Sequence, residues 1–322
     1  MGMTIGLGAF FLVLFFTAMY LYFNLAQRFG IMDIPNSRSS HLNITIRGGG
    51  IIFLFALLMY PLWFGFEYIY FLIGVFLVGV VSFIDDINPI SNKIRFSVHI
   101  VAALLIFLQL KIFDLPLYVI CASLIIIVGI INAFNFMDGI NGLSGLYSFV
   151  TILTLLYINN EKVEFVSNNV LLIMIFALIV FNFFNFRTKA TCFAGDVGSI
   201  TIAFFIIFLL FKLTISSDNL SYFLFIILYG LDTLTTILFR LLRRENIFEA
   251  HRTHYYQYLV NERGIKHLYI SIIYAFVQVV FNLLIILFNF SFLQALVFVI
   301  IIFVLFIILR FKSEGTTRLL GR

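Results

Sequence analysis

Long apolar segments, separated by short polar ones, run through the whole chain. A segment of roughly 17–25 mostly apolar residues is long enough to cross a bilayer as an α-helix. About eleven such segments can be drawn, although several need flanking residues to reach that length, 199–211 most of all. They are residues 3–25, 51–66, 68–84, 96–110, 117–131, 143–158, 170–186, 199–211, 220–242, 268–288 and 292–309. The pattern predicts an all-α, polytopic integral membrane protein.

The boundary between the second and third segments is the least marked. A single helix over residues 51–84 would be about 50 Å long, which exceeds the hydrocarbon core of a bilayer. The polar interruption lies at Gly65-Phe66-Glu67. We therefore expect a hairpin of two spans at this point.

Composition excludes a water-soluble protein. Hydrophobic residues make up 63% of the chain and charged residues 11%, whereas a soluble domain carries about 25% charged residues. The first segment lacks a basic leader and a small-residue cleavage site, so we interpret it as a retained span. Cys121 and Cys192 offer no disulfide framework. We expect one transmembrane domain over residues 1–322.

The basic residues predict the orientation. With the N-terminus outside and the C-terminus in the cytoplasm, all but three of the 20 Lys and Arg residues lie on the cytoplasmic side; the exceptions are Lys111, Lys162 and Lys212. This asymmetry agrees with the positive-inside rule. The net charge of +5 then reflects loops near anionic lipid, not binding to nucleic acid.

Acidic and amide residues gather at the predicted cytoplasmic side. Asp85-Asp86, the run from Asn135 through Asp138 and Asn141, and Asp196 each interrupt or end an apolar segment. Carboxylates at the edge of a bilayer are costly, so several on one side indicate a functional site. Their oxygens are the ligands that Mg²⁺ prefers, which predicts a divalent metal that holds phosphates. The structural alternatives are a polar loop, and helix capping by Asp86 or Asp196.

Basic and imidazole side chains accompany these motifs. Lys93 and Arg95 follow the acidic pair and can hold a phosphate, and the later loop carries His251, Arg252 and His254. A zinc site on the two His residues is disfavoured, because no Cys lies near them.

Two further features each leave two interpretations open. The run Arg-Gly-Gly-Gly at 47–50 allows backbone N–H groups to approach an anion, or forms a turn into a close-packed span. Asp232, inside a predicted span, either lines the floor of the site or pairs with a neighbouring helix.

Together, the motifs resemble those of the polyprenyl-phosphate N-acetylhexosamine-1-phosphate transferases. This family includes the enzymes that start O-antigen and enterobacterial common antigen, and the phospho-MurNAc-pentapeptide translocase. The resemblance covers residues 28–260 and rests on motifs that occur in the family's order. They are Ser39-Ser40-His41, Arg47-Gly-Gly-Gly50, Asp85-Asp86, Asn135-Phe-Met-Asp138-Gly-Ile-Asn141-Gly, Phe193-Ala-Gly195-Asp196-Val-Gly198-Ser199 and Ala250-His251-Arg252-Thr-His254.

The resemblance implies transfer of a sugar-1-phosphate from a UDP-N-acetylhexosamine to undecaprenyl phosphate, with release of UMP, in the bacterial inner membrane. It implies Mg²⁺ as cofactor, with Mn²⁺ as its substitute; our interpretation adds membrane lipid and a second copy of the chain as partners. By position, Asp196 and Asn135 match metal ligands. The expected catalytic group is Asp85, Asp86 and Asp138. The expected substrate-binding residues are Lys93, Arg95, Asn141, Phe193 (which would stack on uracil), His251, Arg252 and His254.

One departure narrows the resemblance. Relatives such as the translocase carry His-x-His-His in the last loop, whereas this chain has His254-Tyr255-Tyr256-Gln257. This resembles the O-antigen and capsule branch and argues against a peptidoglycan precursor as substrate. Two other classes stay as alternatives. A membrane prenyltransferase usually spreads its Asp residues four apart, and a polytopic transporter often shows inverted repeats and charges near the bilayer midplane.

Overall fold

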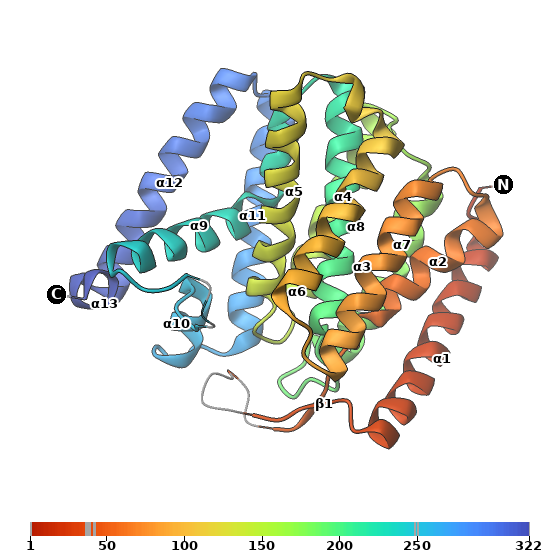
Figure 1. Ribbon diagram of the computed structural model, residues 1–322, viewed down its shortest axis with the longest axis horizontal. Helices are drawn as coiled ribbons and strands as arrows, with labels where there is room; N and C mark the ends of the chain where they lie inside the picture. The colour runs from red at the N-terminus through yellow and green to blue at the C-terminus, as the bar shows by residue number, and fades with distance from the viewer. Residues whose placement is uncertain (1, 36–39, 41–42, 248, 250, 322) are drawn as a thin grey trace.

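The computed structural model describes residues 2–35, 40, 43–247, 249 and 251–321. In this part of the chain, ten helical segments are long and apolar enough to cross a membrane (Figure 1). They are α1 (Ile5–Phe29), α3 (Ile69–Ile87), α4 (Asn92–Leu110), α5 (Leu117–Met137), α6 (Leu143–Glu161), α7 (Asn168–Asn185), α8 (Gly195–Ser217), the segment Leu220–Leu242, α11 (His267–Phe288) and α12 (Phe292–Glu314). The predicted all-α, polytopic membrane architecture is confirmed.

The remaining elements in this part are short. Helix α2 (Ile51–Phe64) has 14 residues, so its length of about 21 Å falls short of a full span, and it is the one predicted crossing that does not reach that length. Gly65 ends α2 at a φ of 95° before α3 begins, which confirms the predicted break between the two helices, although α2 does not reach the length of a span. The others are β1 (Met32–Asp33) and β2 (Thr45–Ile46), which pair antiparallel, η1 (Ile112–Asp114), α10 (Tyr255–Asn261) and α13 (Thr316–Leu320).

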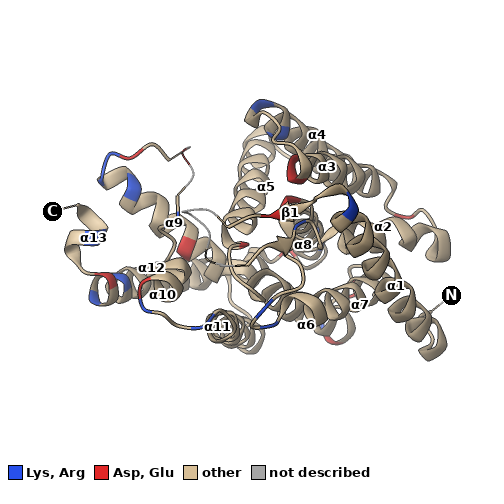
Figure 2. Ribbon diagram, turned by 90° about the horizontal axis from the view of Figure 1, so that it is seen from below, with Lys and Arg blue, Asp and Glu red and all other residues tan. Residues whose placement is uncertain are grey.

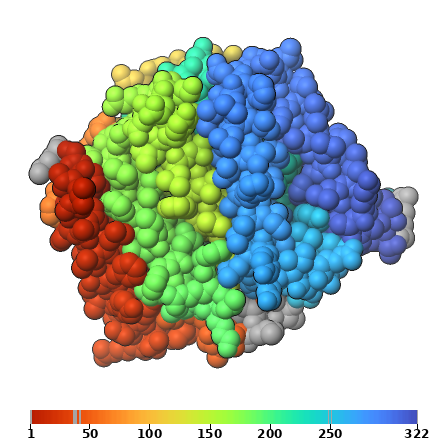
Figure 3. All heavy atoms as spheres, turned by 180° about the vertical axis from the view of Figure 1, so that it is seen from behind, coloured from red at the N-terminus to blue at the C-terminus, as the bar shows by residue number. Residues whose placement is uncertain are grey.

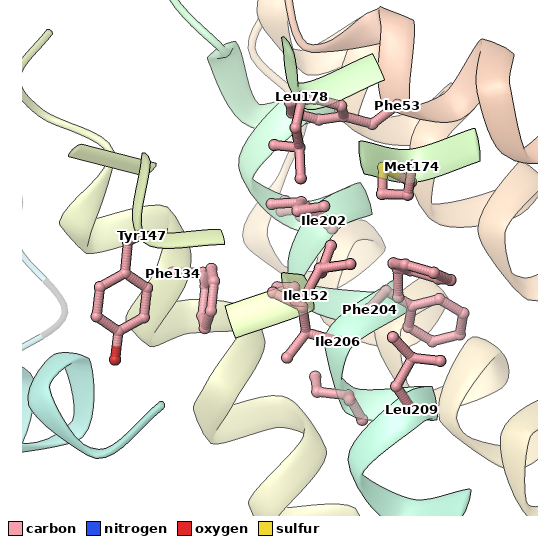
Figure 4. Close-up of a cluster of buried hydrophobic side chains, with 14 of the residues drawn as sticks. Phe53, Phe134, Tyr147, Ile152, Met174, Leu178, Ile202, Phe204, Ile206 and Leu209 are labelled. Carbon is pink, nitrogen blue, oxygen red and sulfur yellow. The ribbon is translucent and has the colours of Figure 1, made fainter. Parts of the chain in front are cut away.

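Helix α8 forms the centre of the bundle. Of an 18-residue window in each helix, 83% is buried in α8 but only 17% in α12. Phe204 and Phe208 of α8 stack on Phe71 of α3, with ring centroids 5.8 and 4.1 Å apart (Phe204 and its neighbours are shown in Figure 4). Because other helices enclose α8, its first turn has a fixed position. This turn lies next to the last turns of α3 and α5 and next to the loop that precedes α2.

The segment Leu220–Leu242 is bent. It begins as the 3-10 helix η2 (Leu220–Ile226) and continues as α9 (Ile227–Leu242), which crosses the direction of α5 in Figure 1. Gln278 of α11 satisfies backbone groups at this change: its Oε1 accepts from the N–H of Leu228 at 3.1 Å, and its Nε2 donates to the carbonyl of Leu224 at 3.0 Å. Such pairing inside a span compensates for the interrupted helix ladder.

Helices α11 and α12 flank the central bundle. From behind, α11 lies along α6 and α12 lies outside it (Figure 3). Large apolar side chains of both helices are exposed on the surface, among them Phe276, Leu287 and Leu305. In a membrane, these side chains face lipid. The end of the bundle that carries β1 is the end at which the polar motifs meet.

Candidate functional site

Asp86 connects α3 to the start of α8. Its Oδ1 accepts from the N–H of Asp196 at 2.9 Å and its Oδ2 from the N–H of Val197 at 3.0 Å. A carboxylate is unfavourable in the last turn of its own helix, but here it faces the positive N-terminal end of another. Asp86, at the end of α3, thus caps the N-terminus of α8. Helix capping by Asp86 was the structural alternative from the sequence, and the capped helix is α8, which lies far along the chain.

Arg47 lies between the two carboxylates of this connection. Its Nε is 2.7 Å from Oδ1 of Asp86, and its Nη2 is 3.7 Å from Oδ1 of Asp196. Tyr22 of α1 donates its hydroxyl hydrogen to the carbonyl of Arg47 and so holds the backbone. The guanidinium group therefore lies beside the N-terminal end of α8, where an anion would bind.

The glycines after Arg47 serve close packing. The N–H groups of Gly49 and Gly50 donate to the carbonyls of Phe193 and Ala194, at 2.7 and 3.0 Å. A Cβ on Gly50 would lie 2.2 Å from Cα of Gly198. This favours the turn into a close-packed span over direct anion binding by these two N–H groups.

Asp196 is the point at which the other motifs converge. Nδ2 of Asn135, in the last turn of α5, donates to its Oδ1 at 3.0 Å. Nη1 of Arg95, in α4, is 3.6 Å from its Oδ2 and 2.9 Å from Oδ2 of Asp85. Three expected acidic residues, one amide and one basic residue therefore meet at one end of the bundle. Figure 2 views the ribbon from below, with Asp and Glu in red and Lys and Arg in blue.

A cavity of about 250 Å³ opens beside this cluster. The residues that line it come from five parts of the chain: 33–47, 135–141, 185, 193–196 and 257. They are Asp33, Ser40, Arg47, Asn135, Asp138, Gly139, Ile140, Asn141, Asn185, Phe193, Gly195, Asp196 and Gln257. Four polar expected residues and Phe193 are thus at the cavity wall, so one ligand could contact the acidic cluster and an aromatic ring together.

Asp138 and Asn141 lie where α5 turns into α6. Burial, together with the smaller effect of the nearby carboxylate of Asp196, raises the pKa of the Asp138 carboxyl group to about 7. Asn141 donates from Nδ2 to the carbonyl of Arg187 at 2.8 Å, while its buried Oδ1 has no hydrogen-bond partner in the described structure. An orphaned buried oxygen at a cavity wall is suited to accept a hydrogen bond from a ligand.

The loop before α10 carries the expected residues His251, Arg252 and His254. None of the three lines the cavity. His254 is buried, with Nδ1 3.3 Å from Oδ1 of Asp232, and the ring of His251 stacks on that of His254 at 5.1 Å. Burial lowers the pKa of His251 to about 4, so it is neutral near pH 7 and does not supply positive charge. Arg252 is exposed.

The geometry does not bring every expected residue to the cavity wall. Arg252, and Lys93 at the start of α4, are exposed and line no part of the cavity. Of the two interpretations left open for Asp232, the structure favours pairing with another helix, because Asp232 accepts from the backbone of α10 and does not line the cavity. Ser39, His41 and Ala250 of the family motifs lie outside the described residues.

Arg47, Asp33 and Gln257 are among the cavity residues that were missed as site residues. Arg47 had a signal, because it precedes the run of three glycines. Gln257 had one too, because it ends the run that departs from the family's pattern. Asp33 had none, since only the β1–β2 pairing carries it to the cavity.

The donor set fits Mg²⁺ when phosphates complete it. Within the described residues, no three or more His, Cys, Asp and Glu side chains are grouped as a metal cage. Mg²⁺, however, is usually held by one or two carboxylates together with substrate phosphates and water. Asp196 offers such a carboxylate, and Asn135 offers an amide oxygen once its amide is turned from the orientation in which Nδ2 faces Asp196.

A known family model matches the central part of the chain. The model described as glycosyl transferase family 4 matches residues 68–214, from just before α3 into the last turn of α8. The matched part contains the acidic cluster, Asn135 and Asp138, but not Arg47 or any element from α9 onward. No curated protein matches the chain. The match supports the broad family of polyprenyl-phosphate sugar-phosphate transferases and an enzyme that transfers a sugar phosphate.

Proposed function

We propose that this protein transfers a sugar-1-phosphate from a UDP-N-acetylhexosamine to undecaprenyl phosphate and releases UMP. The observation that carries the proposal is the meeting of three carboxylates and two guanidinium groups beside a cavity at one end of a membrane-spanning bundle. The dissolved donor can enter this cavity while the lipid phosphate reaches the same surface from the bilayer. The family match over residues 68–214 supports the same reaction class.

The reaction needs positioning and charge neutralisation more than covalent help from the protein. An oxygen of the acceptor phosphate attacks the β-phosphorus of the UDP-sugar, and the bond from that phosphorus to the bridging oxygen of UMP breaks. Arg47 and Arg95 stand within 4 Å of Asp196 and are placed to bind the phosphates. When bound at Asp196 and Asn135, Mg²⁺ would neutralise charge on the diphosphate.

Direct attack by the acceptor is favoured over an aspartyl intermediate at Asp86. Both oxygens of Asp86 already accept backbone hydrogen bonds, and one of them also pairs with Arg47. A carboxylate with its lone pairs so occupied is a poor nucleophile. The acceptor phosphate, by contrast, has a second pKa near about 6 and is already largely dianionic at neutral pH.

The remaining parts of the proposal follow from the resemblance and from charge distribution. We place the site on the cytoplasmic side of a bacterial inner membrane, with the N-terminus outside. The product would start a lipid-linked surface polysaccharide such as O-antigen or capsule. Phe193, at the cavity wall, would stack on uracil. The use of Mn²⁺ in place of Mg²⁺ and assembly as a homodimer stay predictions.

The test is release of UMP by purified protein given undecaprenyl phosphate and a panel of UDP-sugars. Activity should require Mg²⁺ and vanish with EDTA, and Asp196→Ala should abolish it. Asp114→Asn is the matched control, because Asp114 is an exposed carboxylate in η1, at the far end of α4 from the site. A membrane prenyltransferase would release pyrophosphate in place of UMP, and a transporter would move solute without breaking a bond. Either result, or full activity of Asp196→Ala, would contradict the proposal.

A further inference from the structure

Asp232 of α9 is a fully buried carboxylate in a part of the chain that the family match does not cover. Its Oδ1 accepts from the N–H of Tyr255 at 2.8 Å, and its Oδ2 from the N–H of Tyr256 at 3.1 Å. The hydroxyl of Tyr274, on α11, donates to Oδ2 at 2.6 Å. The carboxylate thus caps α10 from another helix, as Asp86 does for α8.

A buried cation completes this arrangement. Arg310 of α12 is 1% exposed, and its Nη1 donates to the hydroxyl oxygens of Thr235 and Thr236 at 3.0 and 2.8 Å. Its Nη2 donates to the carbonyl of Thr253, in the segment that leads into α10, at 3.1 Å. A buried ionic network adds little net stability compared with apolar packing of the same volume. Its use here is to fix where α10 begins.

The docked α10 reaches the end of α5. The hydroxyl of Tyr256 donates to the carbonyl of Phe136 at 2.9 Å. Gly139 makes this approach possible, because a Cβ there would lie 2.2 Å from Oη of Tyr256. Phe136 follows Asn135, which contacts Asp196, and precedes Asp138 by two residues. The next residue of α10, Gln257, lines the cavity.

We propose that Asp232 is a positioning residue for the transfer reaction: it docks α10 so that Tyr256 holds the Asn135–Asp138 end of α5 in place. The inference rests on the proposed function for its kinetic readout. It assigns a role to α9 and α10 that does not depend on contact between Asp232 and substrate, since Asp232 is absent from the cavity wall. The path is continuous, from Asp232 through the backbone of α10 and the hydroxyl of Tyr256 to the carbonyl of Phe136.

The kinetic test is a double-mutant cycle of Asp232→Asn and Tyr256→Phe in the purified, full-length protein. Asp232→Asn keeps the shape of the side chain but removes its charge and turns an N–H donor toward the donors of α10. We expect kcat for UMP release to fall about tenfold or more, as for loss of hydrogen bonds to a charged group. Tyr256→Phe should lower kcat several-fold. The double variant should lie within about twofold of Asp232→Asn, because both changes break one path.

Backbone hydrogen exchange of residues 133–141 gives a readout that needs no activity. Asp232→Asn and Tyr256→Phe should both speed exchange there, while Asp114→Asn, a control far from the site, should not.

Multiplicative losses of kcat in the double variant, or unchanged exchange at 133–141, would overturn the inference. If Asp232→Asn does not fold, Tyr256→Phe and Gly139→Ala carry the test: unchanged kcat and exchange in both would overturn it. A folded wild-type protein that releases no UMP overturns the proposed function, and the exchange result still decides this inference.

Discussion

Asp86 and Asp196 are joined by a hydrogen bond from the N–H of Asp196 to Oδ1 of Asp86, 2.9 Å long. The carboxylate of Asp86 therefore fixes the backbone that carries the side chain of Asp196. Arg47 bridges the two side chains, with its nitrogens 2.7 and 3.7 Å from their respective oxygens. The adjacent acidic residues of α3 thus have different roles, because Asp86 fixes the first turn of α8, whereas Asp85 pairs with Arg95.

Asp86→Asn tests this division of roles. The amide cannot accept from Asp196, Val197 and Arg47 together, so the cap weakens and we expect a loss of about 1–2 kcal/mol in the free energy of unfolding. UMP release should fall at least about a hundredfold, because Asp196 moves with the first turn of α8. Thermal unfolding and UMP release measure the two effects.

Asp85→Asn is the matched control for the cap. It should reduce UMP release while it leaves the melting temperature close to that of the wild type, because Asp85 does not contact α8's first backbone N–H groups. Equal melting temperatures for the Asp85 and Asp86 variants would contradict the assignment of the cap to Asp86.

Much of the fold follows from the apolar pattern, because a bilayer demands long helices with internally paired backbones. The pattern located the α2–α3 hairpin at Gly65 and required flanking residues for the 199–211 segment, which the structure extends to Gly195–Ser217. It did not reveal the bend at Ile226, because one apolar segment, Leu220–Leu242, continues across η2 and α9. The bend depends on Gln278, about 50 residues later in the chain, and no local pattern records that pairing.

Residue type placed Asp85, Asp86, Asn135 and Asp196 at one site, and geometry brings them together. The sequence could not show that Asp86 caps α8, because a cap on a distant helix has no spacing signal. For the same reason it left the role of Asp232 open between two interpretations. Lys93 is close to Asp86 in sequence, but it is exposed and does not line the cavity.

The contact between Gly50 and Gly198 should not tolerate even one methyl group. A Cβ on Gly198 would lie 2.7 Å from Cα of Gly50, and both atoms belong to backbone that cannot move aside easily. Gly198→Ala should therefore separate α2 from α8 and cost about 1–3 kcal/mol or more by overpacking. The measurement is thermal unfolding of the purified variant in detergent, with UMP release as a second readout.

Gly129→Ala is the control for that substitution. Gly129 lies within α5 and has open space where a Cβ would stand. Alanine favours a helix interior over glycine by up to about 1 kcal/mol, so this variant should be as stable as the wild type or more so. Similar destabilisation by Gly129→Ala and Gly198→Ala would show that the close contact is not the cause.

The raised pKa of Asp138 predicts opposite effects of Asp138→Asn on stability and activity. Burial raises this pKa from 3.8 to about 7, so the folded protein favours the protonated carboxyl group. Stability is then retained below pH 4 and lost progressively as pH rises to 7, where the folded state must ionise a buried acid. Asp138→Asn, which cannot ionise, should therefore melt a few degrees higher than the wild type at pH 8 and at the same temperature near pH 4.

Activity should respond in the other direction. If the ionised carboxylate takes part in catalysis, wild-type UMP release at saturating substrate rises as pH increases through about 7, and Asp138→Asn is both slow and insensitive to pH in that range. The ionised form of Asp138, which would be the active form, then lowers the stability of the fold. A loss of stability in return for activity is expected of a catalytic group held in an unfavourable environment. A variant that melts higher at pH 8 yet keeps the wild-type pH profile of UMP release would remove Asp138 from the catalytic group and leave it a buried acid of the α5–α6 turn.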